Sequence, residues 1–117
     1  MHELAVTESI MNIVLRHART NRVRKVVSIT LHIGELSDLE DEWMQHYFDY
    51  LSKETVVAGA RLKIERLPIE LNCTACGRTF AIEKSALGTS VCPDCGATGD
   101  FSLVSGRQYY IKEMEAV

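Results

Sequence analysis

The spacing of apolar and polar residues changes several times along the chain, and each spacing predicts a different element. Over residues 3–20 apolar side chains recur every three or four positions, which is typical of an amphipathic helix. The apolar positions are Val6, Ile10, Ile13, Val14 and Ala18. Residues 26–33 alternate between apolar and polar side chains instead, which predicts a half-buried strand that ends at Gly34.

A second helix and two further strands are predicted after Gly34. Residues 37–40, Ser-Asp-Leu-Glu, match a capping box and predict a helix that runs to about residue 54. Its expected core-facing side chains are Leu39, Trp43, Met44, Tyr47, Phe48 and Leu51. Residues 61–67 and 107–115 alternate again and predict two more strands.

These elements predict an α/β (α+β) fold in which two helices cover one face of a small three-stranded mixed sheet. The strand–helix–strand order of residues 26–67 favours a parallel pair with a right-handed crossover. The strands at 61–67 and 107–115 flank residues 72–106 and are expected to pair antiparallel. Residues 72–106 have too few apolar side chains for a core of their own, so we expect an inserted, zinc-ribbon-like module. The predicted domains are residues 1–71 plus 107–117, and residues 72–106.

The cysteines supply the strongest chemical signal, because the chain has four and they form two Cys-x-x-Cys pairs. The pairs are Cys73 with Cys76 and Cys92 with Cys95. This spacing is typical of a structural zinc site with four thiolate ligands, since each pair turns two sulfurs toward one ion. Gly77 and Gly96 follow the pairs and can adopt the left-handed conformation that such turns need. Iron, two disulfides and a redox-active pair are alternatives that the spacing favours less.

Composition and charge narrow the classes of function. A chain of 117 residues is long enough to bury the core of one domain. Its net charge of −3 argues against general binding to nucleic acid or anionic membranes. No apolar run approaches the roughly 20 residues that span a bilayer, and the first residues do not resemble a secretory signal. We therefore expect a cytoplasmic protein without membrane or nucleic-acid partners.

Two clusters of like charge each allow two interpretations. Acidic residues gather where the second helix is expected to begin, at Glu35, Asp38, Glu40, Asp41 and Glu42. Stabilisation of a helix N-terminus explains them most simply, and attraction or ligation of a metal is the alternative. Basic residues gather at the end of the first helix, at Arg16, Arg19, Arg22, Arg24 and Lys25. A solvated helix end is the simpler explanation here, and contact with an acidic face of a partner is the alternative.

The chain begins Met1-His2-Glu3, and these residues offer donor atoms for a metal ion. An imidazole next to main-chain nitrogens can surround a divalent ion with nitrogen donors, a set that suits nickel(II) or copper(II). Together with Ile-Gly-Glu-Leu-Ser at residues 33–37 and the paired Cys-x-x-Cys motifs, this start closely resembles the HypA/HybF family of hydrogenase nickel-insertion proteins. The resemblance covers essentially the whole chain.

The resemblance implies a nickel metallochaperone and not an enzyme. Such a protein binds Ni(II) as transient cargo at its N-terminus and helps deliver it to the large subunit of NiFe-hydrogenase. Its implied partners are the maturation GTPase HypB and, for some members, urease maturation proteins, and it would be a monomer or homodimer. Carried over by position, the implied nickel ligands are His2 and Glu3, with Glu40 as a further candidate, and the four cysteines would hold structural Zn(II).

Two other classes of function compete with this interpretation. A zinc-ribbon adapter could bind nucleic acid or another protein, but residues 72–106 carry only two cations against three anions. An enzyme, either a thiol oxidoreductase or a metal hydrolase, would need a nucleophile–base set or an open metal position. The sequence offers no such set, and four thiolates would close the metal site.

Overall fold

The computed structural model describes residues 3–117, and the chain divides into two compact units. The helical unit contains Met1–Leu31, Asp38–Glu65 and Tyr110–Val117. The cysteine unit contains His32–Ser37 and Arg66–Tyr109. The functional division predicted above, a nickel-binding domain and a zinc-binding module, stays a prediction.

The first helix of the helical unit, α1, spans Glu3–Thr20, as its periodicity predicts. Its buried face includes Ile10, Val14 and Ala18. The expectation for Ile13 is wrong, because 45% of this residue is exposed. Glu3 and Thr7 continue the same stripe toward the start of the helix and are buried although they are polar, which apolar periodicity could not reveal.

Strand β1 (Val26–Gly34) is the centre of a three-stranded sheet whose order is β2-β1-β6, with β2 at Arg61–Leu67 and β6 at Tyr109–Ala116. The Val26 N–H donates to the Val56 carbonyl and the Glu35 N–H to the Leu67 carbonyl, so β1 and β2 run parallel as predicted. Lys25 and Val117 exchange two backbone hydrogen bonds, which fits an antiparallel β1–β6 pair.

The predicted pairing of β2 with β6 is wrong, because each of them pairs with β1 instead. The physical reason is the burial of β1. Ile29, Leu31 and Ile33 are buried, and so are Ser28 and Thr30 on the other face. A strand that is covered on both faces suits the middle of a sheet better than its edge, so the expectation of a half-buried β1 is also wrong.

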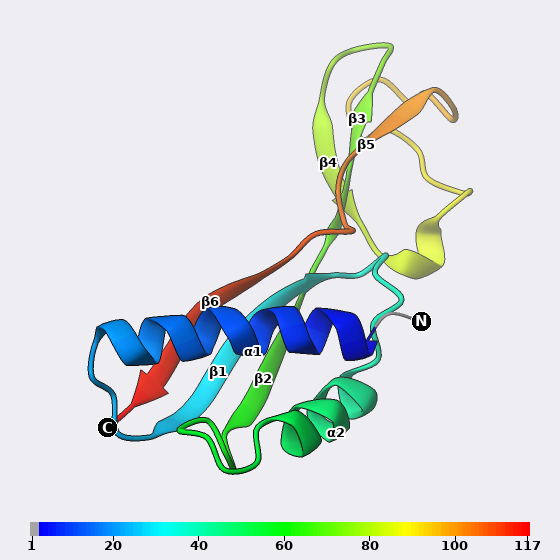
Figure 1. Ribbon diagram of the computed structural model, residues 1–117. Coiled ribbons are helices and arrows are strands. Elements are labelled where there is room, and N and C mark those ends of the chain that lie inside the picture. The colour runs from blue at the N-terminus through cyan, green and yellow to red at the C-terminus, as the bar shows by residue number, and fades with distance from the viewer. Residues whose placement is uncertain (1–2) are drawn as a thin grey trace. The chain divides into compact units, whose positions relative to one another are not determined.

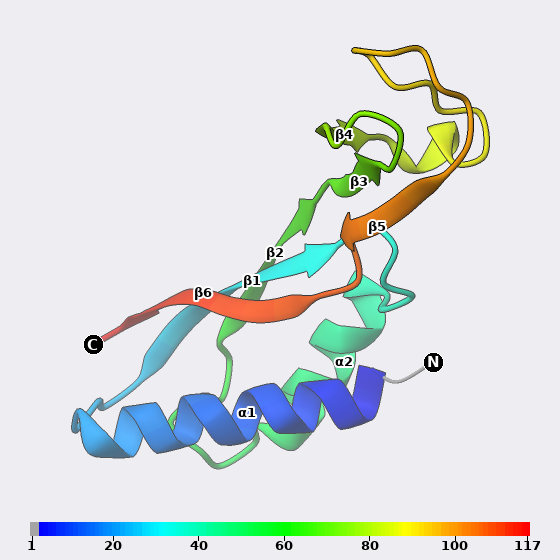
Figure 2. The ribbon, with the colours of Figure 1, turned by 90° about the horizontal axis from the view of Figure 1, so that it is seen from above.

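The second helix, α2, spans Asp41–Leu51, and both helices lie on one face of the β2-β1-β6 sheet, as predicted (Figures 1 and 2). Ser37 is not the N-cap of this helix. Glu40 is the N-cap and makes no side-chain cap, while the Ser37 N–H closes a turn on the Gly34 carbonyl. The helix therefore begins after the predicted start at residue 37.

The side of α2 that faces the core is narrower than predicted. Leu39, Met44 and Phe48 are buried, with Phe48 fully so, but 47% of Trp43 is exposed. Trp43 stacks on Tyr47, which is half-buried, at a ring-centroid distance of 5.8 Å. Spacing alone predicts that Trp43 and Tyr47 face the core, but the fully buried side chains of this helix are Met44 and Phe48.

The cysteine unit contains an antiparallel sheet of order β4-β3-β5. Its elements are β3 at Ile69–Cys73, β4 at Thr79–Ile82, the short 3-10 helix η1 at Lys84–Ala86, and β5 at Phe101–Ser105. The rings of Phe80 in β4 and Phe101 in β5 meet edge to face, with centroids 5.3 Å apart. Strand β3 was not expected because Pro68 interrupts the pattern just before it.

The Ile-Gly-Glu-Leu-Ser stretch of residues 33–37 has a structural role in the cysteine unit. Backbone hydrogen bonds join Gly34 to Gln108, Glu35 to Leu67 and Leu36 to Gly106. A methyl group on Gly34 would come within 2.0 Å of the Gly106 carbonyl oxygen, so no side chain fits there. The glycine is thus required by the close approach of two backbone segments, and its own φ angle is ordinary.

Candidate metal centre

The two Cys-x-x-Cys pairs form two turns with the same backbone pattern. In the first, the Gly77 N–H donates to the Cys73 carbonyl, and in the second the Gly96 N–H donates to the Cys92 carbonyl, at 2.7 and 3.0 Å. Gly77 and Gly96 have φ angles of 80° and 75°. This is the left-handed conformation expected of them, and it lets each chain fold back around its sulfur pair.

Both turns are closed in the same way and aim their sulfurs at one point. The Cys73 N–H donates to the Arg78 carbonyl at 2.8 Å, and the Cys92 N–H donates to the Ala97 carbonyl at 2.9 Å. Strand β3 delivers the first turn, since Cys73 is its last residue and pairs in register with Phe101 of β5. The sheet therefore fixes one half of the centre, and the turn of Cys92 supplies the other half.

The sulfur positions fit a tetrahedral ion. All four sulfurs lie within 4.8 Å of one another, and the Cys73–Cys95 and Cys76–Cys92 separations are both 3.6 Å. Four thiolates at roughly 2.3 Å from a zinc ion would lie roughly 3.8 Å apart. A disulfide would require roughly 2.05 Å, and all four cysteines are free thiols. Among residues 3–117, no other group of three or more such side chains converges in this way.

The pKa values of Cys92 and Cys76 are shifted in opposite directions. Backbone N–H groups of Cys95 and Asp94 lower the pKa of Cys92 to about 7. The N–H of Arg78 acts to lower the pKa of Cys76, but hydrogen bonding with the Cys92 thiol and burial outweigh it and raise that pKa to about 12. The thiolate of Cys92 is therefore favoured beside a Cys76 thiol that keeps its proton. A divalent cation would stabilise all the thiolates, so its binding would release protons.

Two polar contacts around the centre were not anticipated from the sequence. The Arg78 guanidinium pairs with the Asp94 carboxylate at 3.0 Å and joins the two cysteine turns. The Asn72 side-chain amide donates to the Gly77 carbonyl at 3.0 Å and supports the first turn. Both arise between residues next to the cysteines, but nothing in their spacing distinguishes them from other surface polar groups.

The residues predicted to bind nickel are placed differently. His2 lies outside the described residues. Glu3 is the first residue of α1 and is 3% exposed, and it is engaged in an interaction in the folded chain. Glu40 is exposed at the N-cap of α2. Within residues 3–117 neither carboxylate belongs to a group of three or more potential metal ligands.

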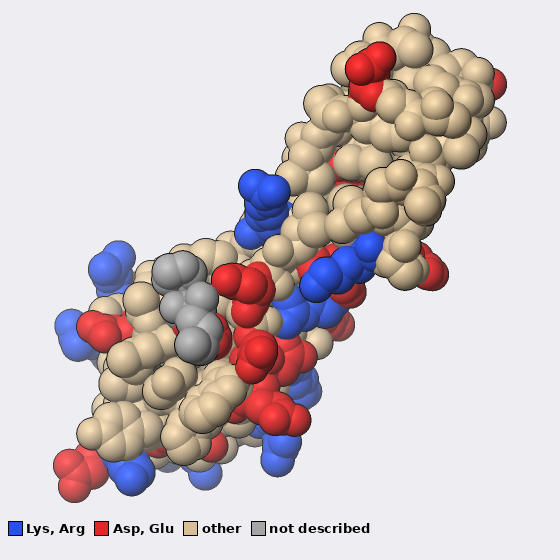
Figure 3. Space-filling view, turned by 90° about the vertical axis from the view of Figure 1, so that its right-hand side faces the viewer, with Lys and Arg blue, Asp and Glu red and all other residues tan. Residues whose placement is uncertain are grey.

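The charged surface agrees with the acidic clustering seen in the sequence. The face drawn in Figure 3 carries several acidic side chains close together with basic side chains beside them, whereas much of the surface of the cysteine unit in that view is uncharged. Asp41 and Glu42 lie in the first turn of α2, where their negative charges interact favourably with the positive end of the helix dipole. No helix within residues 3–117 has the length and apolar character that crossing a membrane requires.

Comparison with known proteins identifies similar chains over nearly the full length. A family model described as hydrogenase/urease nickel incorporation, metallochaperone, hypA, matches residues 1–116. A protein named hydrogenase maturation factor HypA from Caldanaerobacter subterraneus subsp. tengcongensis is 37% identical over 115 residues, which cover 98% of each chain. One of the same name from Methanocella arvoryzae is 35% identical over 115 residues, covering 98% of this chain and 97% of the relative.

Two solved structures share the fold. The solution structure of a HypA protein aligns with a TM-score of 0.74 at 26% identity, covering 100% of this chain and 97% of that one. The solution structure of the Ni metallochaperone HypA from Helicobacter pylori aligns with a TM-score of 0.68 at 24% identity, covering 100% and 98%. The two helices and the mixed three-stranded sheet therefore recur in independently determined structures.

Proposed function

This chain belongs to the HypA family, and from that membership we propose that it is a nickel metallochaperone that binds Ni(II) at its N-terminus and delivers it during NiFe-hydrogenase maturation. The match of the family model to residues 1–116 carries the proposal. The maturation GTPase HypB and the hydrogenase large subunit are the proposed partners, and urease maturation proteins are further candidates. The protein acts as a cytoplasmic carrier and not as an enzyme.

The nickel site that we propose uses nitrogen donors at the start of the chain. His2 supplies its imidazole and its main-chain nitrogen, a donor set that suits Ni(II). Glu3 contributes through its main-chain amide, because its side chain is buried in the folded chain. Glu40 is exposed in the same unit and is a candidate for a further ligand. A site at the chain terminus suits transfer, because the ligands of a partner can replace the donors one at a time.

The second metal in the proposal is Zn(II), held by Cys73, Cys76, Cys92 and Cys95. When bound, zinc supplies a cross-link that needs no redox chemistry. Four protein ligands leave no open position, so this metal stays with the chain while nickel is exchanged. The fit of the sulfur separations to a tetrahedral ion supports this assignment.

A nickel titration by calorimetry on the zinc-loaded, tag-free chain tests the proposal. One nickel per chain is expected for the unaltered protein, and none for His2→Ala with its zinc still bound. His46→Ala is the matched control, because His46 is an exposed histidine on α2 and should leave the titration unchanged. Equal nickel binding by the unaltered protein and His2→Ala would remove the N-terminal site.

A second candidate function, a protein adapter that docks through the cysteine unit, is favoured by one observation. Four large apolar residues of this unit are substantially exposed. They are Leu87 at 42%, Val91 at 52%, Leu103 at 41% and Val104 at 54%. This role is compatible with nickel transfer, since a carrier must dock on its partners.

The adapter role has its own test, because it predicts a loss of docking without a loss of metal. Val104→Ser is expected to weaken binding to purified HypB while nickel and zinc contents stay unchanged. Full HypB binding by Val104→Ser and by Leu103→Ser would exclude docking through β5.

A further inference from the structure

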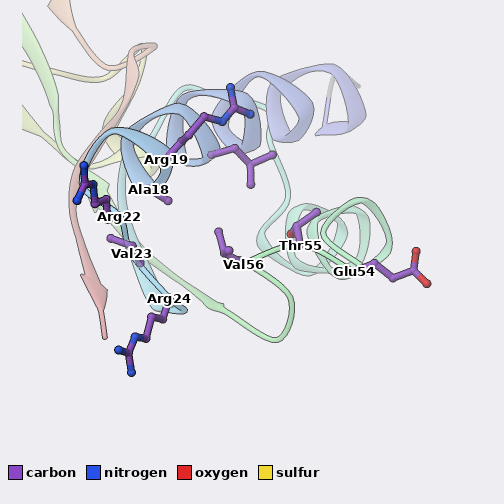
Figure 4. A pocket seen from close by; sticks show the side chains of 9 residues that line it. Ala18, Arg19, Arg22, Val23, Arg24, Glu54, Thr55 and Val56 are labelled. Atoms are coloured by element: carbon purple, nitrogen blue, oxygen red, sulfur yellow. The ribbon is translucent and has the colours of Figure 1, made fainter.

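A cleft of about 580 Å³ lies in the helical unit, between the end of α1 and the loop that follows α2. Its floor is apolar and is formed by Leu15, Ala18, Val23 and Val56. Figure 4 shows Ala18, Val23 and Val56 between the surrounding charged side chains. The cleft uses none of the residues assigned above to nickel or zinc.

Three arginines border this cleft: Arg19, Arg22 and Arg24. Within residues 3–117 none of them forms an ion pair. Figure 4 shows their side chains pointing in different directions around the apolar floor, while Glu54 lies on the opposite side and points away. Stabilisation of the helix dipole accounts for Arg19 in the last turn of α1, but Arg24 lies beyond that turn and needs another reason.

Backbone conformation distinguishes this cleft from an ordinary surface groove. The Val23 N–H donates to the Ala18 carbonyl and the Arg22 N–H to the Arg19 carbonyl, which is a Schellman motif with Arg22 at the position that favours glycine. Arg22 has a φ angle of 54°, and Glu54 across the cleft has one of 64°. A charged side chain is thus held at two positions where glycine would be more stable. At Arg22 such an exception is expected if the side chain serves binding, whereas Glu54 points away from the floor and is assigned no such role.

We propose that this cleft binds an acidic segment of a partner protein, with one apolar side chain on the floor and carboxylates on the arginines. The splayed guanidinium groups suit an extended chain that carries several carboxylates, and they do not converge on one small anion. An acidic ligand complements the positive charge of the three arginines that border the floor. A nucleic acid is disfavoured, because the chain as a whole has a net charge of −3.

The test is an NMR titration of the ¹⁵N-labelled, zinc-loaded, nickel-free protein. The probe is a synthetic peptide with glutamates on both sides of one phenylalanine, and the control peptide has glutamines instead. Amide shifts are expected at residues 15–24 and 54–56 with the acidic peptide only, and they should shrink at high salt. Because nickel is absent, the outcome is independent of the proposed nickel site. Absence of shifts at these residues would overturn the proposal.

Arg22→Gly and Glu54→Gly form a matched pair of variants. Each removes a left-handed non-glycine residue, so each should raise the Tm. Arg22→Gly should also weaken the acidic peptide about five-fold, since it loses an exposed ion pair. Glu54→Gly should bind it at least as tightly as the unaltered protein. Unchanged binding by Arg22→Gly would show that the arginine has no role in a site.

Two further outcomes would assign the cleft to another occupant and so overturn the proposal. Shifts at the same residues on dilution of the protein alone would indicate a second copy of this chain. A stronger response to a short oligonucleotide than to the acidic peptide would indicate nucleic acid.

Discussion

The two units of this protein differ in the interactions that stabilise each of them. In the described part of the helical unit, aliphatic and aromatic side chains from both helices and the sheet are buried, among them Ile29, Met44 and Phe48. In the cysteine unit the buried apolar residues are three aliphatic side chains and two cysteines. They are Ile33, Ile69, Leu71, Cys73 and Cys92. Since burial of apolar area is the main stabilising term, only the helical unit has a core of ordinary size.

Ordered secondary structure in the two units therefore has different origins. The sheet β4-β3-β5 has few buried apolar residues, so we expect its stability to depend on a metal ion held by the four sulfurs, which lie within 4.8 Å of one another. Binding of a metal at such a site is folding free energy, on the order of 10–16 kcal/mol for structural zinc in small domains. The helical unit needs no such cross-link. The two units should therefore respond oppositely to loss of metal and to loss of core volume.

The largest effect is expected from Cys73→Ser, which removes one buried sulfur of the centre. The cysteine unit should lose its metal and its ordered β3, β4 and β5, while α1, α2 and the β2-β1-β6 sheet remain. Amide NMR spectra recorded before and after the substitution distinguish the two sets of residues. A strong chelator added to the unaltered protein should reproduce the spectrum. Retention of the β3–β5 cross-peaks without metal would show that the sheet is stable by itself.

The converse substitution, Phe48→Ala, removes a fully buried ring from the helical unit. It should lower the free energy of unfolding of that unit by about 3–5 kcal/mol, because the ring is lost and a cavity remains. Urea titrations monitored at amides of both units give the unit-resolved values. Tyr50→Ala is the control, since Tyr50 lies on the same helix and is 66% exposed. Equal loss of stability in both units would mean that they unfold as one.

A smaller effect is expected from Gly34→Ala, which tests a close backbone approach inside the cysteine unit. The added methyl group would lie 2.0 Å from the Gly106 carbonyl oxygen, so backbone must move, at a cost of about 1–3 kcal/mol. Gly99→Ala is the matched control in the cysteine unit, because its methyl group would meet nothing within 4 Å and its φ is not left-handed. Thermal melts of the metal-loaded proteins should show a lower Tm for Gly34→Ala alone. Equal Tm values would show that the backbone yields without cost.

The sequence correctly predicts the elements whose pattern depends on neighbouring residues. The periodicity of α1, the alternation of β1 and β2, and the glycines after each cysteine pair all depend on a few neighbouring residues. The four cysteines were brought together as their spacing predicts, and the glycine angles followed. These are properties of single turns and strands, so no tertiary information was needed.

The failures arose where tertiary contacts override a local pattern. Ser37 was read as a cap, but its backbone closes a turn on Gly34. Trp43 was placed in the core, but the sheet accepts Met44 and Phe48 and leaves Trp43 half exposed. The order of the strands could not be read from the chain, because it depends on which strand is covered on both faces.

The smallest predicted effect concerns an ion pair on the open face of the helical unit. The Lys63 ammonium lies 2.8 Å from the Glu115 carboxylate, and both side chains are more than half exposed. Hydrogen bonding to Glu115 raises the pKa of Lys63, and hydrogen bonds from Lys63 and then Ser28 lower the pKa of Glu115. Both shifts mean that the charged pair is favoured in the folded state.

The pH dependence of this pair follows from the directions of the two shifts. The lowered pKa of Glu115 gives stability that is present above its unfolded pKa and is lost as the pH falls through the lower, folded pKa. The raised pKa of Lys63 gives stability that is lost as the pH rises above about 10.5. Lys63→Met should therefore lower the Tm slightly between these limits and not outside them, and salt should reduce the difference. Lys112→Met is the control and should have a smaller effect, because the Lys112–Glu65 distance is 3.6 Å. A Tm difference for Lys63→Met that persists in acid once Glu115 is protonated would locate the role of Lys63 in packing of its alkyl chain, since protonation of Glu115 leaves that contact in place.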